Sequence, residues 1–149
     1  MIWKPSVTVA AIAERDGRFL LVEEHTNRGQ RFNQPAGHLD PGESLIHAVV
    51  RETLEETACA FEPTGLLGIY QYHSGADDVT YIRFAFTGNI TGLEEGRPLD
   101  AGIIRAVWLT PREIRRETAR HRSPLVMRCI DDYLAGRRFP LDVLHHHSP

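Results

Sequence analysis

Residues 37–56 are the most informative part of the chain, and they read Gly37-His38-Leu39-Asp40-Pro41-Gly42-Glu43-Ser44-Leu45-Ile46-His47-Ala48-Val49-Val50-Arg51-Glu52-Thr53-Leu54-Glu55-Glu56. From Ser44 onward this stretch has no proline or glycine, and its apolar residues recur three and four positions apart. The periodicity predicts an amphipathic helix, with Ser44 as its N-cap and one broad apolar face packed against a core.

Three glutamates, Glu52, Glu55 and Glu56, lie beside the apolar face of this predicted helix. Spacings of three and four bring their side chains together. Like charges at such spacings cost about 0.2–0.5 kcal/mol per pair, and the cost rises near a core because the dielectric falls. A hard divalent cation would remove that cost, since it binds carboxylate and carbonyl oxygens and keeps positions for a substrate phosphate. The alternative interpretation is a solvated acidic helix face.

The spacing of the charged residues carries a family resemblance. Gly37 is followed after five residues by Glu43, and after seven more by Arg51-Glu52-x-x-Glu55-Glu56. This pattern resembles the signature of the Nudix hydrolases, which cleave diphosphate linkages in nucleotides and related compounds with Mg²⁺. Thr53 and Ala58 depart from the family pattern, which usually has an aliphatic residue and a glycine there. Thr53 is close to valine in shape, whereas Ala58 would cost roughly 1–2 kcal/mol if its backbone is left-handed.

The resemblance implies a role for each signature residue. Glu52 and Glu56 would be the principal Mg²⁺ ligands, because a four-residue spacing aims both side chains at one point. Glu55 would be either a ligand or the base that takes the proton from water. Glu43 and Arg51 would form a supporting ion pair that fixes the loop against the helix. The full implied ligand set, with Mn²⁺ as a substitute ion, is the Gly37 carbonyl, Glu52, Glu55 and Glu56.

Further candidates lie outside the signature. Asp100, in a long loop, is favoured over Glu94 and Glu95 as an additional carboxylate. Arg83 alternates with apolar residues in a predicted strand, so its side chain faces either solvent or a cleft, where a guanidinium would match a phosphate bidentately. The remaining substrate-binding candidates are Asn33 and Gln34, and the other cations that could contribute are Lys4, Arg18, Arg28 and Arg31.

Aromatic and histidine side chains give less specific signals. Tyr70, Tyr72 and Phe32 are candidates for stacking on a base, although aromatic residues in strands more often pack in a core or across strands. His38 and His73 could be metal ligands, but a lone histidine in a loop usually is not. The tail at 145–147 consists of three histidines, which could bind adventitious metal.

The order of predicted elements indicates an α/β fold with a mixed sheet, and the resemblance implies the Nudix α/β/α sandwich. Asp16-Gly17 predicts a hairpin turn between two of the strands. Thr110-Pro111 with Glu113 predicts a capping box at the start of a helix, and Ser123-Pro124 is expected to open the last helix in the same way. The predicted strands are 6–13, 18–23, 66–72, 80–90 and 104–109, with loops at 25–34 and 91–102 and a stop for the last helix at Gly136.

Length and composition restrict the class of protein. A chain of 149 residues is expected to form one domain, residues 1–149. The net charge of −3 gives no bulk attraction to nucleic acid or to an anionic membrane, so phosphate recognition must be local. Cys59 and Cys129 have no metal-site spacing and are expected to be free core thiols in a reducing compartment. With no membrane span, and with residues 7–13 better explained as a strand than as a signal core, we expect a cytoplasmic protein, either monomer or dimer.

The resemblance also points to a branch of the family. Residues 32–39 and 122–126, with Lys4-Pro5 and residues 138–141, resemble the bacterial NudJ-type Nudix hydrolases. That branch implies phosphatase activity on nucleoside tri- and diphosphates and on the pyrophosphate of the thiamine pyrimidine precursor, with release of phosphate. Two alternatives stay open: a MutT-like pyrophosphohydrolase that releases pyrophosphate, and a Nudix domain that only senses a nucleotide. The sensor usually lacks one of the signature glutamates, all of which are present here.

Overall fold

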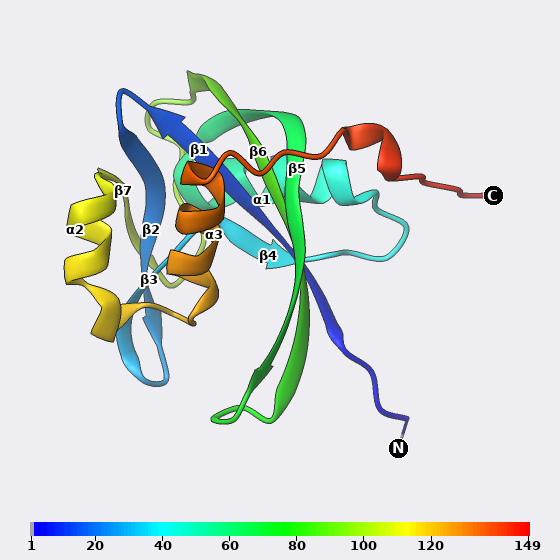
Figure 1. The fold of residues 1–149 in the computed structure, drawn as a ribbon, viewed down its shortest axis with the longest axis horizontal. Helices are drawn as coiled ribbons and strands as arrows, with labels where there is room; N and C mark the ends of the chain where they lie inside the picture. Colours follow the sequence, from blue (N-terminus) through cyan, green and yellow to red (C-terminus); the bar gives the residue numbers. More distant parts are fainter. Residues whose placement is uncertain (1) are drawn as a thin grey trace.

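The computed structural model describes residues 2–149, which form a seven-stranded mixed sheet with helices on both of its faces (Figure 1). Five strands run in the order β3-β2-β1-β6-β5, while β4 pairs with β1 and β7 pairs with β2. Only β1 and β6 are parallel among these pairs. The strands are β1 Ser6–Arg15, β2 Arg18–Thr26, β3 Gly29–Asn33, β4 Ala36–His38, β5 Cys59–Ser74, β6 Val79–Leu93 and β7 Ile103–Leu109.

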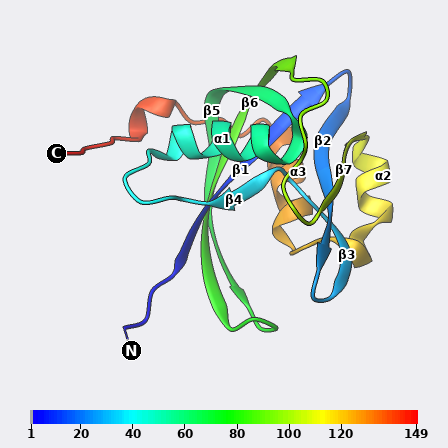
Figure 2. The same ribbon diagram turned by 180° about the vertical axis from the view of Figure 1, so that it is seen from behind.

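The helices form two layers around the sheet. They are α1 Leu45–Thr57, α2 Pro111–Arg116 and α3 Leu125–Leu134, with short 3-10 helices at Thr118–Arg120 and Leu141–Val143. Helix α1 lies behind the sheet in Figure 1 and in front of it in Figure 2, whereas α3 lies on the other face. Among residues 2–149 there is no helix that is long and apolar enough to cross a membrane.

Strand β1 explains how both layers are held. Because successive side chains of a strand point to opposite faces, Ala10 and Ile12 join the cluster under α2 and α3, while Val9 and Ala11 join the cluster under α1. Such a strand is buried on both faces and reads as a continuous apolar run. The predicted strand at 6–13 is therefore confirmed as the centre of an α/β/α arrangement.

The predicted start and end of α1 are found in the structure. The Ser44 hydroxyl accepts a hydrogen bond from the His47 amide at 3.0 Å. Ala58 ends the helix with a left-handed backbone, φ 63°, and its amide donates to the Leu54 carbonyl at 2.9 Å. Thr53 is buried and its hydroxyl donates to the Val49 carbonyl, so the substitution at this position is accommodated.

Several other local predictions are also confirmed. Asp16 and Gly17 both have positive φ, as the turn of the β1–β2 hairpin requires. Thr110 and Glu113 form the complete capping box of α2. Gly136 follows α3 with φ 84°. Cys59 and Cys129 are both buried free thiols.

The predicted loop at 25–34 is wrong, because β2 continues to Thr26 and β3 returns from Gly29 to Asn33. Four of the five β3 residues are glycine or polar, and Gly29 and Gln30 are exposed at this edge of the sheet, while Phe32 packs in the core. An exposed edge strand does not need the apolar alternation by which strands are recognised.

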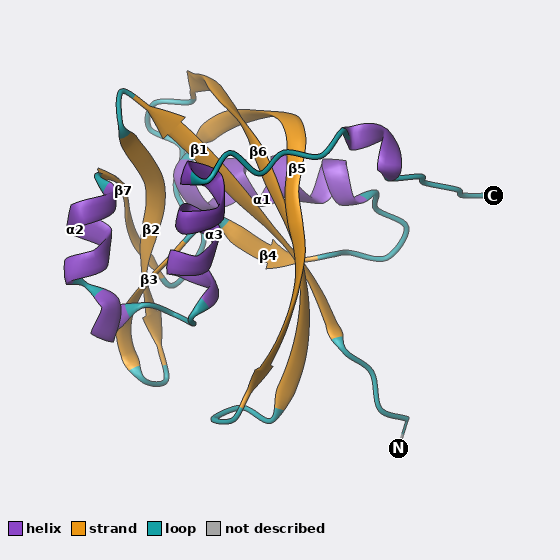
Figure 3. Ribbon diagram, in the orientation of Figure 1, coloured by secondary structure: helices purple, strands orange, loops and turns teal. Residues whose placement is uncertain are grey.

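Strands β5 and β6 are longer than predicted and project as a ribbon beyond the rest of the sheet (Figure 3). The predicted strand began at Leu66, but β5 begins at Cys59 and passes through Pro63 and Gly65 with shifts of register against β6. The start of α3 also differs from the prediction. Pro124 takes the N-cap position without a side-chain cap, and the Ser123 hydroxyl accepts only from the Leu125 amide.

Candidate active site

The signature loop and α1 are locked together through Arg51. Its guanidinium donates to both oxygens of Glu43, at 2.7 and 2.9 Å, and to the His38 carbonyl at 3.0 Å. The same side chain reaches Glu52 at 2.8 Å and Glu55 at 2.9 Å. Hydrogen bonds from Arg51 lower the pKa of Glu43 to about 2. The geometry thus contains the predicted Glu43–Arg51 pair and extends it to two of the signature glutamates.

Gly37 lies on β4 directly against the Glu52 carboxylate. A Cβ atom built on Gly37 would stand 2.1 Å from Glu52 Cδ, so this position has no room for any side chain. Strand β4 is held in place by its antiparallel pairing with β1, in which Gly37 faces Val9. The backbone of the signature loop and the acidic face of α1 therefore approach as closely as their atoms allow.

Three carboxylates gather at one end of this arrangement. Oxygen atoms of Glu52, Glu55 and Asp100 all lie within 4.8 Å of one another. Asp100 reaches the helix from the loop before β7, where its amide donates to the Glu55 carbonyl at 3.0 Å. A cluster of hard oxygen donors, of which Arg51 balances only part of the charge, has the chemistry that a divalent cation such as Mg²⁺ requires.

Glu56 points to a different part of the site. Its carboxylate accepts a hydrogen bond from the Ala36 amide at 2.9 Å. Burial raises the pKa of Glu56 to about 9, and the charges of Glu24 and Glu52 act in the same direction. Burial also raises the pKa of Glu52. We expected Glu52 and Glu56 to converge, but the close cluster instead unites Glu52 with Glu55 and Asp100, while Glu52 and Glu56 both line the adjoining cavity.

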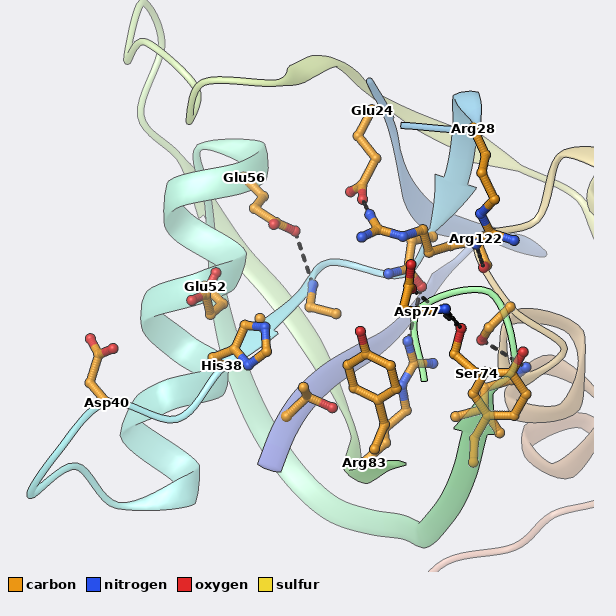
Figure 4. A pocket seen from close by; sticks show the side chains of 18 residues that line it. Glu24, Arg28, His38, Asp40, Glu52, Glu56, Ser74, Asp77, Arg83 and Arg122 are labelled. Atoms are coloured by element: carbon orange, nitrogen blue, oxygen red, sulfur yellow. Dashed lines mark hydrogen bonds and ion pairs between the residues drawn. The ribbon is translucent and has the colours of Figure 1, made fainter. Parts of the chain in front are cut away.

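This cavity has a volume of about 340 Å³, with the acidic side chains of α1 on one side and three arginines, one of them paired with Glu24, on the other. Figure 4 shows Glu52 and Glu56 projecting from α1 on one side, with Arg28, Arg83 and Arg122 across from them. A polyanion with bound cations at one end would find complementary charge at both ends. The remaining lining residues are Thr8, Glu24, Asn33, Ala36, Gly37, His38, Asp40, Tyr72, Ser74, Asp77, Tyr81, Ser123 and Leu125.

Arg83 faces this cavity rather than solvent, although it is only 6% exposed. Its guanidinium donates to Gln34 Oε1 and to Asn33 Oδ1, both at 2.9 Å, and approaches Cys129 Sγ at 3.7 Å. Among the ion pairs formed by residues 2–149, none includes Arg83. A buried cation held only by neutral acceptors has the chemistry to bind an anion.

The comparisons with known proteins agree with this geometry. A family model described as the Nudix domain matches residues 3–129. Over 143 residues the chain is 36% identical to phosphatase NudJ of Escherichia coli strain K12. The matched residues make up 96% of this chain and 92% of that protein. The chain belongs to the Nudix hydrolase family.

Solved structures place the fold of this Nudix hydrolase in the same family. A Nudix hydrolase from Nitrosomonas europaea is 51% identical, with a TM-score of 0.95 over 97% of this chain and 98% of that one. A MutT Nudix hydrolase from Burkholderia pseudomallei has a TM-score of 0.74 over 87% of this chain and 98% of that one. Its 20% identity supports the fold alone. The predicted α/β Nudix sandwich is confirmed.

Some candidate residues of this Nudix hydrolase do not line the cavity. Gln34 is 1% exposed, its amide donates to the Val126 carbonyl at 2.8 Å, and its oxygen accepts from Arg83. We expected Gln34 to bind substrate, but the structure places it beneath Arg83, where it orients the guanidinium. Phe32 is a core residue with Arg120 over its ring, and the Tyr70 hydroxyl donates to Asp132 at 2.7 Å.

Of the other cation and histidine candidates, some line the cavity and some do not. Arg28 and His38 line the cavity. Arg18 pairs instead with Glu113, and Arg31 donates to the neighbouring Gln30 carbonyl. The remaining two also have no place in the cavity lining, since Lys4 is exposed near the N-terminus and His73 lies near Asp78 at the tip of the β5–β6 ribbon.

A second charged pair in the cavity, Glu24 with Arg122, was not predicted from the sequence. Arg122 contacts Glu24, and Arg28 donates to the Arg122 carbonyl at 3.2 Å. Burial raises the pKa of Glu24, although the charge of Arg122 opposes this effect. Glu24 and Arg122 are distant in sequence, and no spacing rule links them. The available signal was a glutamate continuing an apolar strand, but the predicted strand ended at Glu23, one residue before Glu24.

Proposed function

We propose that this Nudix hydrolase uses Mg²⁺ to hydrolyse phosphoanhydride bonds of nucleoside di- and triphosphates and related small pyrophosphates. The observation that carries the proposal is the cavity itself, in which the acidic face of α1 stands opposite the buried cation Arg83. The 36% identity with a phosphatase supports inorganic phosphate as the product. The thiamine pyrimidine precursor pyrophosphate is included as a substrate because the resemblance to the NudJ branch implies it.

The ion would be held by Glu52, Glu55 and Asp100, with the Gly37 carbonyl and Glu56 as further ligands. When bound, Mg²⁺ neutralises phosphate charge and lowers the pKa of the attacking water. Phosphoryl transfer asks little covalent chemistry of the protein, so positioning and charge carry the rate. Arg51 contributes to the positioning, because its hydrogen bonds fix the carboxylates of Glu52 and Glu55.

The chain's own residues account for the remaining parts of the reaction. Arg83 holds the phosphate chain through the guanidinium N–H groups that its bonds to Asn33 and Gln34 leave free. Asn33, whose Oδ1 accepts one of those bonds, contributes its side-chain amide N–H groups. Glu55 or Glu56 accepts the proton of the water molecule whose oxygen bonds to phosphorus. The bond from that phosphorus to the bridging oxygen breaks. The leaving group is the part of the phosphate chain that keeps the bridging oxygen, and it takes the electron pair of the broken bond.

The test is a screen of nucleotides with Mg²⁺ for phosphate release, with and without added inorganic pyrophosphatase. Phosphate released without the helper enzyme supports the proposal. Phosphate that appears only with the helper enzyme indicates the MutT-like reaction, in which pyrophosphate leaves. Binding of nucleotide without any turnover would indicate the sensor. Glu56→Gln should lose most turnover, whereas Glu62→Gln, a change of an exposed glutamate on β5, is the matched control.

A further inference from the structure

The order of strands fixes the order of groups across the cavity. Strands β4, β1, β6 and β5 lie side by side, with His38 opposite Thr8, Thr8 opposite Arg83, and Arg83 opposite Tyr70. Neighbouring strands are about 4.8 Å apart, so β4 and β6 are separated by about 10 Å. The signature glycine and the acidic face of α1 adjoin β4. Arg83 therefore stands in the middle of the cavity, and β5 lies one strand further from the glutamates.

Two tyrosines occupy the far side of Arg83. Tyr72 on β5 is directly opposite Tyr81 on β6, and Tyr81 is two residues before Arg83, so it lies on the same face of the ribbon. Both line the cavity and are half-buried. These two rings provide flat apolar surface in the cavity, against which a planar group could lose its water.

Tyr72 and Tyr81 differ in their hydrogen bonds from Tyr70 and Tyr133, whose hydroxyl groups bind other parts of the fold. The Tyr70 and Tyr133 hydroxyls donate to Asp132 and Glu14, at 2.7 and 2.9 Å. Neither the Tyr72 nor the Tyr81 hydroxyl has a hydrogen-bond partner within the part of the chain that the structure describes. Their polar ends are thus free of any role in tying the fold together.

The tip of the β5–β6 ribbon borders the cavity next to these rings. Ser74 is buried, and its hydroxyl bonds the Asp77 carboxylate and accepts from the Asp77 amide, at 3.3 and 3.4 Å. Both residues line the cavity beside Tyr72. Ser74 and Asp77 therefore border the part of the cavity that Tyr72 and Tyr81 line.

We propose that Tyr72 and Tyr81 form a ring subsite, which takes the heteroaromatic ring of the substrate while its phosphates extend past Arg83 toward α1. The inference rests on the proposed function, since it assigns the non-phosphate part of the same substrate. Stacking on an aromatic side chain tolerates different bases, because each base presents a π-face. The substrate class is therefore a phosphoanhydride linked to a nucleobase-like ring, with little discrimination among bases.

The test compares ligands that cannot be hydrolysed, so that it does not depend on turnover. The α,β-methylene analogues of ADP and UDP carry a ring, and methylenediphosphonate carries the same phosphonates without one. Calorimetry with Mg²⁺ gives the ratio of the dissociation constant of methylenediphosphonate to that of the tighter nucleoside analogue. This ratio measures what the nucleoside, ring and ribose together, contributes to binding, and the tyrosine variants isolate the part that comes from the ring.

For the unaltered protein the ratio should be tenfold or more, and the double variant Tyr72→Ala/Tyr81→Ala should reduce it about tenfold. The single alanine variants should each give part of that loss. The double variant Tyr72→Phe/Tyr81→Phe should keep the ratio, because phenylalanine retains the stacking face. Tyr70→Phe, a change on the same strand outside this cavity, is the matched control and should not alter the ratio.

A ratio near one in the unaltered protein, no binding of any analogue, or an undiminished ratio in folded alanine variants would each overturn the ring subsite. A purely structural role of the cross-strand pair would lower the melting temperature without changing the ratio. If the analogues bind with the expected ratio but no nucleotide is hydrolysed, the proposed function fails while the subsite stands.

Discussion

Arg51 and Glu43 are joined by two hydrogen bonds, from Nε to Oε2 at 2.7 Å and from Nη2 to Oε1 at 2.9 Å. This fork closes the signature loop onto α1, and a third bond from Arg51 to the His38 carbonyl fixes the end of β4. The pair therefore contributes to the stability of the loop, and neither of its residues lines the cavity, although Arg51 also holds Glu52, which does. Its contribution can be separated from catalysis by its dependence on pH.

Glu43→Gln should lower the free energy of unfolding by about 1–2 kcal/mol at pH 7. The folded pKa of Glu43 is lowered from 4.5 to about 2, so the stabilisation is complete above about pH 4.5 and is lost as the pH falls toward 2. Urea denaturation at several pH values should show the difference between variant and unaltered protein shrinking over that window. A difference that stays constant from pH 7 to pH 2 would contradict the assignment. Glu62→Gln serves as the control.

Gly37→Ala should reduce the catalytic rate at least tenfold while the protein stays folded. The new Cβ would meet Glu52 Cδ at 2.1 Å and force the carboxylate out of place, and small displacements of positioned groups have large effects on rate. Phosphate release and the melting temperature are measured on the same sample. Gly92→Ala is the matched control, because the nearest atom to its Cβ is 3.9 Å away. Equal activity of the two variants would refute the proposed closeness of β4 and Glu52.

Asp100→Asn should weaken Mg²⁺ activation several-fold. Its carboxylate completes the cluster with Glu52 and Glu55, and replacing a charged oxygen donor with an amide lowers affinity for a hard cation. The Mg²⁺ concentration for half-maximal phosphate release is the measured quantity. Asp142→Asn, in the exposed Leu141–Val143 segment, controls for a general loss of negative charge. An unchanged Mg²⁺ requirement in Asp100→Asn would remove this residue from the metal site.

Arg83→Lys should lower kcat/KM roughly tenfold or more. Lysine keeps the charge but cannot form the planar fork that Asn33 and Gln34 orient. Steady-state kinetics with a nucleoside triphosphate measures the effect, and thermal unfolding reports whether the buried site is intact. A variant with unaltered kinetics would show that Arg83 does not contact substrate.

The sequence was sufficient where the physical cause is local. Ser44, Gly17 and the Thr110–Glu113 capping box act through neighbouring backbone atoms, and each lies where its pattern predicts. The strand β3 was missed because this edge strand has a single buried apolar residue, Phe32, and therefore no apolar alternation. The first part of β5 was also missed, because the strand passes through Pro63 and Gly65 by shifts of register that depend on the partner strand and not on the local sequence.

The same distinction, between features with a local cause and features that depend on distant parts of the chain, applies to the candidate site. Helical spacing was enough to gather Glu52, Glu55 and Glu56 on one helix, and Asp100 was the favoured additional carboxylate, but the spacing did not predict that Glu56 lies outside the close cluster. Pairings such as Glu24 with Arg122 depend on how β2 and the segment before α3 meet in space. Tyr81 gave no signal of its own, because its place in the cavity follows from the register of β6 with β5.

The central claim is that the carboxylates of α1 carry a metal-dependent hydrolysis of phosphoanhydrides. The most direct measurement is phosphate release from a nucleoside triphosphate by the unaltered protein and by Glu52→Gln, each with Mg²⁺ and with EDTA. We predict turnover by the unaltered protein that EDTA abolishes, and a loss of at least about a hundredfold in Glu52→Gln. Turnover that survives EDTA, or a Glu52→Gln variant as active as the unaltered protein, would contradict the account.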